Sequence, residues 1–234
     1  MNIETGILTS TALSIGFFHT LMGPDHYLPF IMIARAQKWS NLKTIIITIC
    51  CGFGHVLSSI AIGFIGIGAG IAITRVEGFE GMRGNIAAYL LFGFGLAYMI
   101  WGFRKAYKGE VHEHPHVHAN GNTHGHIHTH ETDHGHVHKS NKNTVWWLFI
   151  IFVLGPCEPL IPILMYPAAK SSTMGIVSVA LVFCIATVGT MTLIVTLGIT
   201  GLKQVRFGFL EKYAHAIGGA IIALSGAGMI FLGL

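Results

Sequence analysis

Long apolar runs separated by short polar segments make up most of the chain. Each run is about 20 residues or longer, which is enough for a helix to cross the ~30 Å hydrocarbon core of a bilayer. The runs are continuously apolar and do not alternate between apolar and polar positions. The pattern therefore predicts an all-α integral membrane protein with six transmembrane helices. The six runs lie near residues 7–34, 46–74, 86–103, 145–169, 175–202 and 214–234.

The composition agrees with this class of protein. Only 10% of the 234 residues are Asp, Glu, Lys or Arg, whereas a soluble domain carries about 25%. The formal charge is +4, but the basic residues lie between the apolar runs and form no stripe, so we expect no nucleic-acid partner. Residues 1–6 contain no basic segment, and we expect the first span to stay in the mature protein.

The basic residues are divided unequally between the loops of a six-span chain. Loops 2 and 4 hold three of them, Arg75, Arg83 and Lys170. Loops 1, 3 and 5 hold eleven, namely Arg35, Lys38, Lys43, Arg104, Lys105, Lys108, Lys139, Lys142, Lys203, Arg206 and Lys212. Lys and Arg concentrate in cytoplasmic loops. We therefore expect a multi-pass protein of the plasma or inner membrane, with both termini outside and the third loop in the cytoplasm.

The chain also divides into two similar halves. The third loop, residues 109–144, separates three apolar runs in residues 1–108 from three in residues 145–234. The first span contains Gly-Pro-Asp-His at 23–26, and the fourth contains Gly-Pro-Cys-Glu at 155–158. Three spans per half is an odd number, so the halves insert with opposite orientation. The sequence predicts two inverted three-helix repeats with broken first and fourth helices, as in many secondary transporters.

A proline accounts for each predicted break. Pro24 and Pro156 have no N–H, and their rings crowd the carbonyl groups of Thr20 and Phe152. Backbone groups released in this way cannot stay unsatisfied in lipid, so they must face protein, water or an ion. Proline kinks that serve helix packing alone are the alternative, but they do not explain why ionisable residues accompany both breaks.

Ionisable and metal-ligating residues collect at these breaks. Asp25 and Glu158 are the only carboxylates expected inside the spans, and an ionised Asp at the centre of a membrane helix costs about 2.5–3.5 kcal/mol. His19 precedes His26 by two helical turns. Imidazole, thiolate and carboxylate donors suit Ni, Co, Zn, Cu or Fe ions, whereas Mg and Ca prefer oxygen. We expect a metal site formed by His19, Asp25, His26, His55, Cys157 and Glu158.

The third loop is rich in histidine. It has too few apolar residues to fold alone, so we expect a flexible cytoplasmic segment. Histidine-rich tracts usually bind metal, and this one would buffer the ion or pass it to a cytoplasmic metallochaperone; a pH-responsive polycation is the alternative. Eleven of the fifteen histidines lie here: His112, His114, His116, His118, His124, His126, His128, His130, His134, His136 and His138.

The first-span sequence Phe-His-Thr-Leu-Met-Gly-Pro-Asp-His at 18–26 resembles the His…Asp-His signature of the nickel/cobalt transporter family. It is most similar to the urease-accessory type of membrane protein in that group. Gly-His at 54–55 resembles the second-span histidine motif of the same family. The resemblance implies a multispan helical permease for Ni²⁺ or Co²⁺, with metal recognition by His19, Asp25, His26 and His55. Five residues separate His19 from Asp25 here, one more than in the usual signature.

Two other functions stay open. The Gly-Pro-Cys of the fourth span resembles the wider superfamily that includes thiol-disulfide transporters and amino-acid or sulfite exporters. A thiol-disulfide relay through Cys157 is the second hypothesis, although the matching position in the first half is Asp25 and not Cys. A small-anion exporter, with the helix N-termini after Gly23 and Gly155 facing the anion, is the third.

The leading expectation is alternating-access transport of a divalent transition-metal ion. Nickel or cobalt is preferred, and we do not expect an enzyme. The sequence leaves open the ion, the direction of transport, the coupling and whether chains associate into homo-oligomers.

Overall fold

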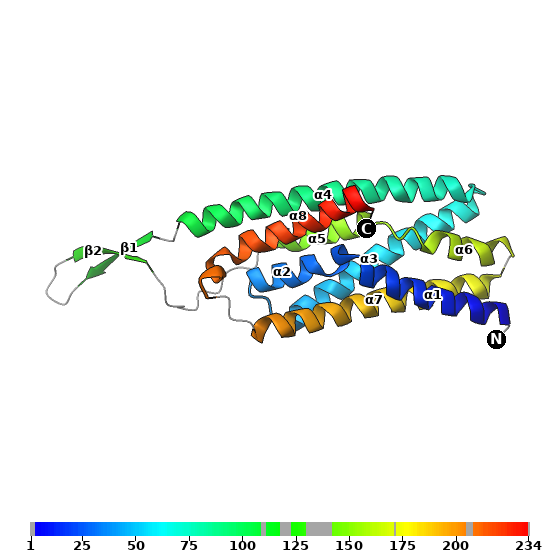
Figure 1. The fold of residues 1–234 in the computed structure, drawn as a ribbon, viewed down its shortest axis with the longest axis horizontal. Coiled ribbons are helices and arrows are strands. Elements are labelled where there is room, and N and C mark those ends of the chain that lie inside the picture. Colours follow the sequence, from blue (N-terminus) through cyan, green and yellow to red (C-terminus); the bar gives the residue numbers. More distant parts are fainter. Residues whose placement is uncertain are drawn as a thin grey trace.

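The computed structural model describes residues 3–108, 111–117, 123–129, 142–170, 172–204 and 208–233. Helices occupy all six of the predicted apolar runs, and the long helices lie roughly side by side (Figure 1). In chain order the elements are α1 (Ile3–Met22), the 3-10 turn η1 (Pro24–His26), α2 (Leu28–Ala36), α3 (Asn41–Gly68), α4 (Ile73–Lys108), β1 (Val111–Val117), β2 (Thr123–Thr129), α5 (Lys142–Leu154), α6 (Leu160–Ala169), α7 (Thr173–Gln204), the 3-10 turn η2 (Gly208–Tyr213) and α8 (Ala214–Leu232).

Several of the helices have the length and composition of membrane spans. Within the described ranges, four are long and apolar enough to cross a membrane: α3, α4, α7 and the segment Glu211–Leu232, which contains α8. A fifth span results if α1 and the segment Pro24–Ala36, which are bent by 83° relative to each other, count as one. The helix α5 is apolar but has only 13 residues. The prediction of a helical, multi-pass membrane protein is confirmed at this level.

Both predicted helix breaks are present. The helix α1 ends at Met22, and helical structure of the α type resumes at Leu28 after the short turn η1. In the second half, α5 ends at Leu154 and α6 begins at Leu160. Each break therefore coincides with a Gly-Pro pair, where the proline removes a backbone donor and crowds the preceding turn.

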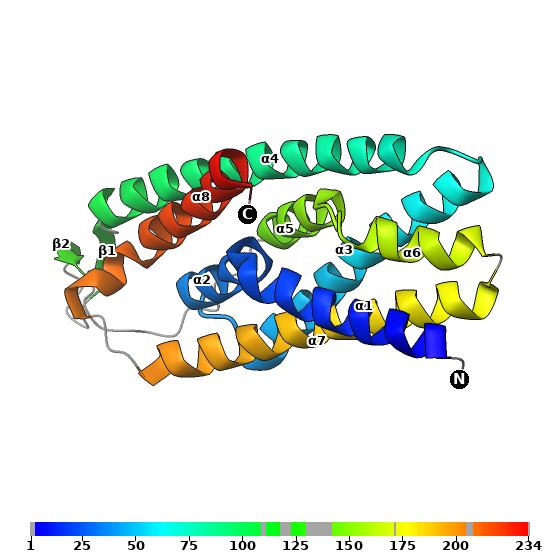
Figure 2. The same ribbon diagram turned by 45° about the vertical axis from the view of Figure 1, so that its right-hand side comes forward.

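Glycines allow two helices of different halves to approach very closely. The helix α8 lies along α4 in both views (Figures 1 and 2), and this pair forms the most extensive helix contact of the structure. A methyl group added at Gly95 would collide with the backbone of Ala223, and one added at Gly219 with the backbone of Met99. Small residues of this kind let membrane helices pack backbone against backbone. Such helices associate through van der Waals contacts, because apolar side chains gain little by leaving apolar lipid.

Polar contacts join the ends of several helices at one end of the molecule. Arg35 after the first break donates to the carbonyl of Leu202 on α7 at 2.8 Å. The amide Nε2 of Gln37 donates to Thr144 Oγ1 on α5 at 3.1 Å, and Lys203 binds Asn41. The segments that follow α2, precede α5 and follow α7 are thus neighbours. They correspond to loops 1, 3 and 5 of the predicted six-span chain, in which most of the basic residues lie.

One sequence-based boundary was wrong. We expected the third span to begin near residue 86 and placed Arg83 in a loop, but α4 begins at Ile73 and includes both Glu80 and Arg83. Glu80 is fully buried and Arg83 is 6% exposed. A hydropathy pattern ends a span at the first charges it meets, and it cannot detect that two charges are paired inside the protein.

The histidine-rich loop contains two short strands that the sequence did not predict. The strands β1 and β2 are antiparallel, and their register pairs His112 with His128, His114 with His126 and His116 with His124. The remaining histidines of the tract lie outside the described residues: His118, His130, His134, His136 and His138.

Candidate metal site

Three histidines from three elements meet beside the broken helices. His19 comes from the last turn of α1, His26 from η1 and His55 from the middle of α3. The ring centroids of His19 and His26 are 4.9 Å apart, and those of His26 and His55 are 5.0 Å apart. The imidazoles of His19 and His26 are therefore adjacent, although α1 and the segment that follows it are bent by 83° relative to each other.

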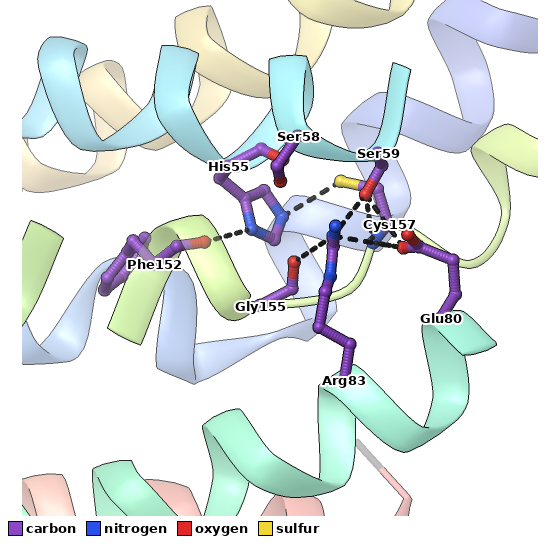
Figure 3. Close-up of polar contacts among 8 residues, drawn as sticks. All are labelled: His55, Ser58, Ser59, Glu80, Arg83, Phe152, Gly155 and Cys157. Carbon is purple, nitrogen blue, oxygen red and sulfur yellow. Dashed lines mark hydrogen bonds and ion pairs between the residues drawn. The ribbon is translucent and has the colours of Figure 1, made fainter. Parts of the chain in front are cut away.

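His55 links the two halves of the chain at the second break. Its Nδ1 lies 3.1 Å from the carbonyl oxygen of Phe152, and its Nε2 lies 2.9 Å from Sγ of Cys157 (Figure 3). The carbonyl of Phe152 is the one that Pro156 cannot bind through an N–H. Donation from Nδ1–H to this carbonyl fixes the tautomer, so the Nε2 lone pair faces the thiol.

His26 is held in the same manner at the first break. Its Nδ1 lies 3.2 Å from the carbonyl oxygen of Gly23 and 3.3 Å from Oδ2 of Asp25. Its Nε2 is buried and has no hydrogen-bond partner in the described part of the chain. Metal-binding histidines commonly donate one ring N–H to a carbonyl or carboxylate and present the other nitrogen to the ion. His26 and His55 both have this arrangement.

Several donor atoms of the cluster converge on one small region. One ligand atom each of His19, His55 and Cys157 lies within 4.8 Å of the other two. Further buried atoms without a partner among the described residues are Nε2 of His19 and Oδ1 of Asp25. Leaving buried polar atoms unpaired is costly. Lone pairs of imidazole and carboxylate that share one site are relieved by a cation.

Two glycines make room for the imidazoles. A methyl group at Gly23 would lie 2.5 Å from Nδ1 of His26, and one at Gly155 would lie 2.9 Å from Nδ1 of His55. Both distances are shorter than any ordinary contact of a methyl carbon with a ring. The Gly-Pro pairs therefore have two functions: proline opens the helix, and glycine lets a histidine reach the opened backbone.

Glu158 does not join the predicted ligands. Its side chain is exposed, and its Oε1 lies near Gly81 of α4, 3.4 Å from where a methyl group on that glycine would stand. The structure brings ligand atoms of His19, His55 and Cys157 within reach of one another, and Asp25 and His26 lie beside them. Glu158 points to a different neighbourhood from its chain neighbour Cys157. Side-chain direction is not fixed by sequence spacing where the backbone is irregular, as it is between α5 and α6.

A buried polar network missed by the sequence analysis lies next to Cys157. Oε2 of Glu80 accepts hydrogen bonds from Ser59 Oγ at 2.8 Å and from Arg83 Nη2 at 3.1 Å. Arg83 Nη2 also donates to Ser59 Oγ at 2.6 Å and to the carbonyl of Gly155 at 2.8 Å (Figure 3). The spacing of Glu80 and Arg83, three apart on one helix, was the available signal for this pair.

The same network reaches the backbone of Cys157. The N–H of Cys157 lies 3.2 Å from Ser59 Oγ and 3.3 Å from Glu80 Oε2. Glu80 and Arg83 of α4 and Ser59 of α3 thus all bind the segment between α5 and α6. We call Ser59, Glu80 and Arg83 the α3–α4 network.

The four cysteines Cys50, Cys51, Cys157 and Cys184 are all described, and all are free thiols. The polar contact of Cys157 Sγ is with an imidazole, which suits a metal ligand. In comparisons with known proteins, no family model, curated protein or solved structure matches the chain.

Proposed function

We propose that this protein transports a divalent transition-metal ion across the membrane, and that the ion binds at the junction of the two broken helices. The observation that carries the proposal is the convergence of ligand atoms of His19, His55 and Cys157, beside buried atoms of Asp25 and His26 that have no hydrogen-bond partner in the described residues. The proposed ligands are His19, Asp25, His26, His55 and Cys157. The ion is the cargo, and these side chains replace part of its hydration shell.

The donor set favours a class of ions. Imidazole and thiolate bind Ni, Co, Zn, Cu and Fe ions well, whereas Mg and Ca ions require oxygen donors. Among these, nickel and cobalt are preferred because residues 18–26 resemble the signature of the nickel/cobalt transporters. One nearby carboxylate, Asp25, offsets part of the cost of moving a dication into the membrane.

We further propose that the chain consists of two inverted repeats of three spans, each with a broken first helix. The packing of the helices supports this proposal. The pairs α3 with α7 and α4 with α8 join equivalent helices, and the packing of α1 on α7 has its counterpart in the packing of α5 and α6 on α3. In such an architecture, rocking of one half against the other exposes a central site to each side in turn.

The orientation is also a proposal. The odd-numbered loops are close neighbours at one end of the molecule, and eleven basic residues belong to them. By the positive-inside rule this end is cytoplasmic. The histidine-rich segment then lies in the cytoplasm, where it would receive an imported ion or load one for export.

The test is metal flux in liposomes that contain the purified full-length chain. Entry of Ni²⁺ or Co²⁺ is followed by a metal-sensitive dye inside the vesicles. We expect flux with the wild type and a loss of about 10–100-fold or more in Asp25→Asn and in His26→Ala. Glu4→Gln is the control, because Glu4 makes only an exposed ion pair with Lys170. Unchanged flux in both site variants would reject the site.

A further inference from the structure

We infer that the α3–α4 network (Ser59, Glu80 and Arg83) is a positioning device that holds Cys157 in reach of the metal, and thereby gives the site its preference for ions that bind sulfur. The inference rests on the proposed function and names the residues that set its specificity. In the part of the chain that the structure describes, none of the three side chains hydrogen-bonds to an imidazole of the cluster. They act through the backbone of Cys157 and its neighbours.

The segment between α5 and α6 cannot set the direction of the Cys157 side chain by itself. Residues 155–159 have no regular helical structure, and among the described residues the N–H of Cys157 donates to no backbone carbonyl. Its contacts are the two oxygens supplied by Ser59 and Glu80. On the other side of Pro156, the carbonyl of Gly155 is held by Arg83. The network therefore holds the backbone on both sides of Pro156, at the carbonyl of Gly155 and at the N–H of Cys157.

Ser59 connects this clamp to the histidine that faces the thiol. It lies four residues after His55 on α3, so both side chains are on the same face of one helix. Nε2 of His55 contacts Sγ of Cys157, while Oγ of Ser59 contacts the N–H of Cys157. One face of α3 thus contacts Cys157 twice, with Ser59 at its backbone N–H and His55 at its sulfur. The fixed spacing of Ser59 and His55 on the helix therefore helps to set the distance between the imidazole and the sulfur.

The two charged residues of the network can be buried because their charges are opposite and paired. An isolated Glu80 or Arg83 would be costly inside the protein, and together they neutralise each other. The hydroxyl of Ser59 is shared between them, because it donates to Glu80 and accepts from Arg83. Without this clamp the site would retain the three imidazoles and Asp25 and would lose the thiolate, which distinguishes soft and borderline ions from hard ones.

The experiment is the absorption spectrum of the full-length protein loaded with Co²⁺. A thiolate bound to Co²⁺ gives a near-ultraviolet charge-transfer band that imidazole and carboxylate do not give, so metal on the histidine-rich loop does not contribute to it. We expect the band in the wild type and its loss in Cys157→Ser. In Ser59→Ala we expect the band to fall at least about two-fold and Co²⁺ affinity to fall about 10–100-fold.

A matched control is adjacent in the chain. Ser58 donates only to the carbonyl of His55 on its own helix, at 2.7 Å, so Ser58→Ala should keep the full band. Arg83→Ala should lose it, and Arg83→Lys should recover part of it, because an ammonium group retains the charge and three donors. If Arg83→Ala does not yield folded protein by circular dichroism, Ser59→Ala decides the question.

The outcomes separate this inference from the proposed function. A wild-type band in both Ser59→Ala and Arg83→Ala, together with its absence in Cys157→Ser, would show that the network only stabilises the fold; the proposed function would stand. Absence of the band from the wild type would overturn the role of Cys157 and of the network together. Metal flux through the liposomes, measured separately, tests transport itself.

Discussion

Nε2 of His55 and Sγ of Cys157 are 2.9 Å apart, although 102 residues separate them in the chain. His55 belongs to the first half and Cys157 to the second, so the two halves touch through a potential ligand pair. In a tetrahedral site with metal–nitrogen and metal–sulfur distances of ~2.0–2.1 and ~2.3 Å, the two atoms lie about 3.5 Å apart. An entering ion therefore has to separate this pair by roughly 0.6 Å.

The first prediction concerns the proton between these atoms. In the metal-free chain the thiol can donate to Nε2 of His55, and a metal ion must displace that proton in order to bind the thiolate. We expect binding of Co²⁺ to release about one proton more from the wild type than from Cys157→Ser. Titration calorimetry in buffers of different ionisation enthalpy measures the number released. Equal proton release from the two proteins would mean that the sulfur is not a ligand.

The second prediction concerns the contact between Asp25 and His26. The substitution Asp25→Asn keeps the shape of the side chain and removes the carboxylate that lies 3.3 Å from Nδ1 of His26. Loss of such a partner typically lowers metal affinity about 10–100-fold. Affinity for Ni²⁺ is measured by competition with a coloured chelator, while circular dichroism monitors the helix content, which should not change. An unaltered affinity would place the ion away from the first break.

The third prediction concerns the space beside His55. In Gly155→Ala the new methyl group would lie 2.9 Å from Nδ1 of His55, so the imidazole must move away from the Phe152 carbonyl. We expect metal binding to weaken at least about ten-fold. Gly189→Ala is the control, since no atom lies within 4 Å of the added methyl group. If the two variants bind metal equally well, the close approach of His55 to the break has no role in binding.

The fourth prediction concerns the contact between α4 and α8. A methyl group in Gly219→Ala would overlap the backbone of Met99, which cannot move without shifting a helix. Overpacking of this kind costs about 1–3 kcal/mol, and thermal unfolding in detergent should show the loss. Gly93→Ala on α4 adds its methyl group into open space and should leave stability unchanged or slightly raised. Equal stability of the two variants would contradict the tight packing described here.

The fifth prediction distinguishes metal bound by the histidine-rich loop from metal bound among the membrane helices. Replacing the eleven loop histidines with Asn should lower the total number of Ni²⁺ ions bound per chain and leave about one tight site, because the membrane ligands are untouched. Equilibrium dialysis of the two full-length proteins gives both numbers. Complete loss of tight binding in the loop variant would confine metal to residues 112–138.

Much of the candidate site was predictable because proline and glycine act locally. Pro24 and Pro156 each remove a backbone donor and crowd the preceding turn, and each follows a glycine, so the two breaks could be located without a structure. His19, Asp25, His26 and Cys157 lie within a few residues of these openings, whereas His55 comes from α3 and meets them through tertiary packing. The exception is Glu158, whose direction depends on irregular backbone.

The α3–α4 network was not predictable in the same way. Glu80 and Arg83 looked like loop residues because each lowers the hydropathy of its surroundings, and only a tertiary contact cancels that effect. Ser59 carries no sequence signal of its own, since a serine in a helix can equally bind a carbonyl of the preceding turn. The function of these residues depends on the backbone of Gly155 and Cys157, 72 to 98 positions away, and no local pattern contains that information.

The carbonyl of Phe152, which accepts from Nδ1 of His55, has a consequence for biosynthesis. A chain still being synthesised inserts residues 1–108 before residues 145–234 exist, so His55 is then without the carbonyl that orients it and without the thiol that it faces. The complete set of donors forms only when the second half docks on the first. A half-made or truncated chain would therefore hold the ion poorly, and capture of metal at this site would report that assembly is finished.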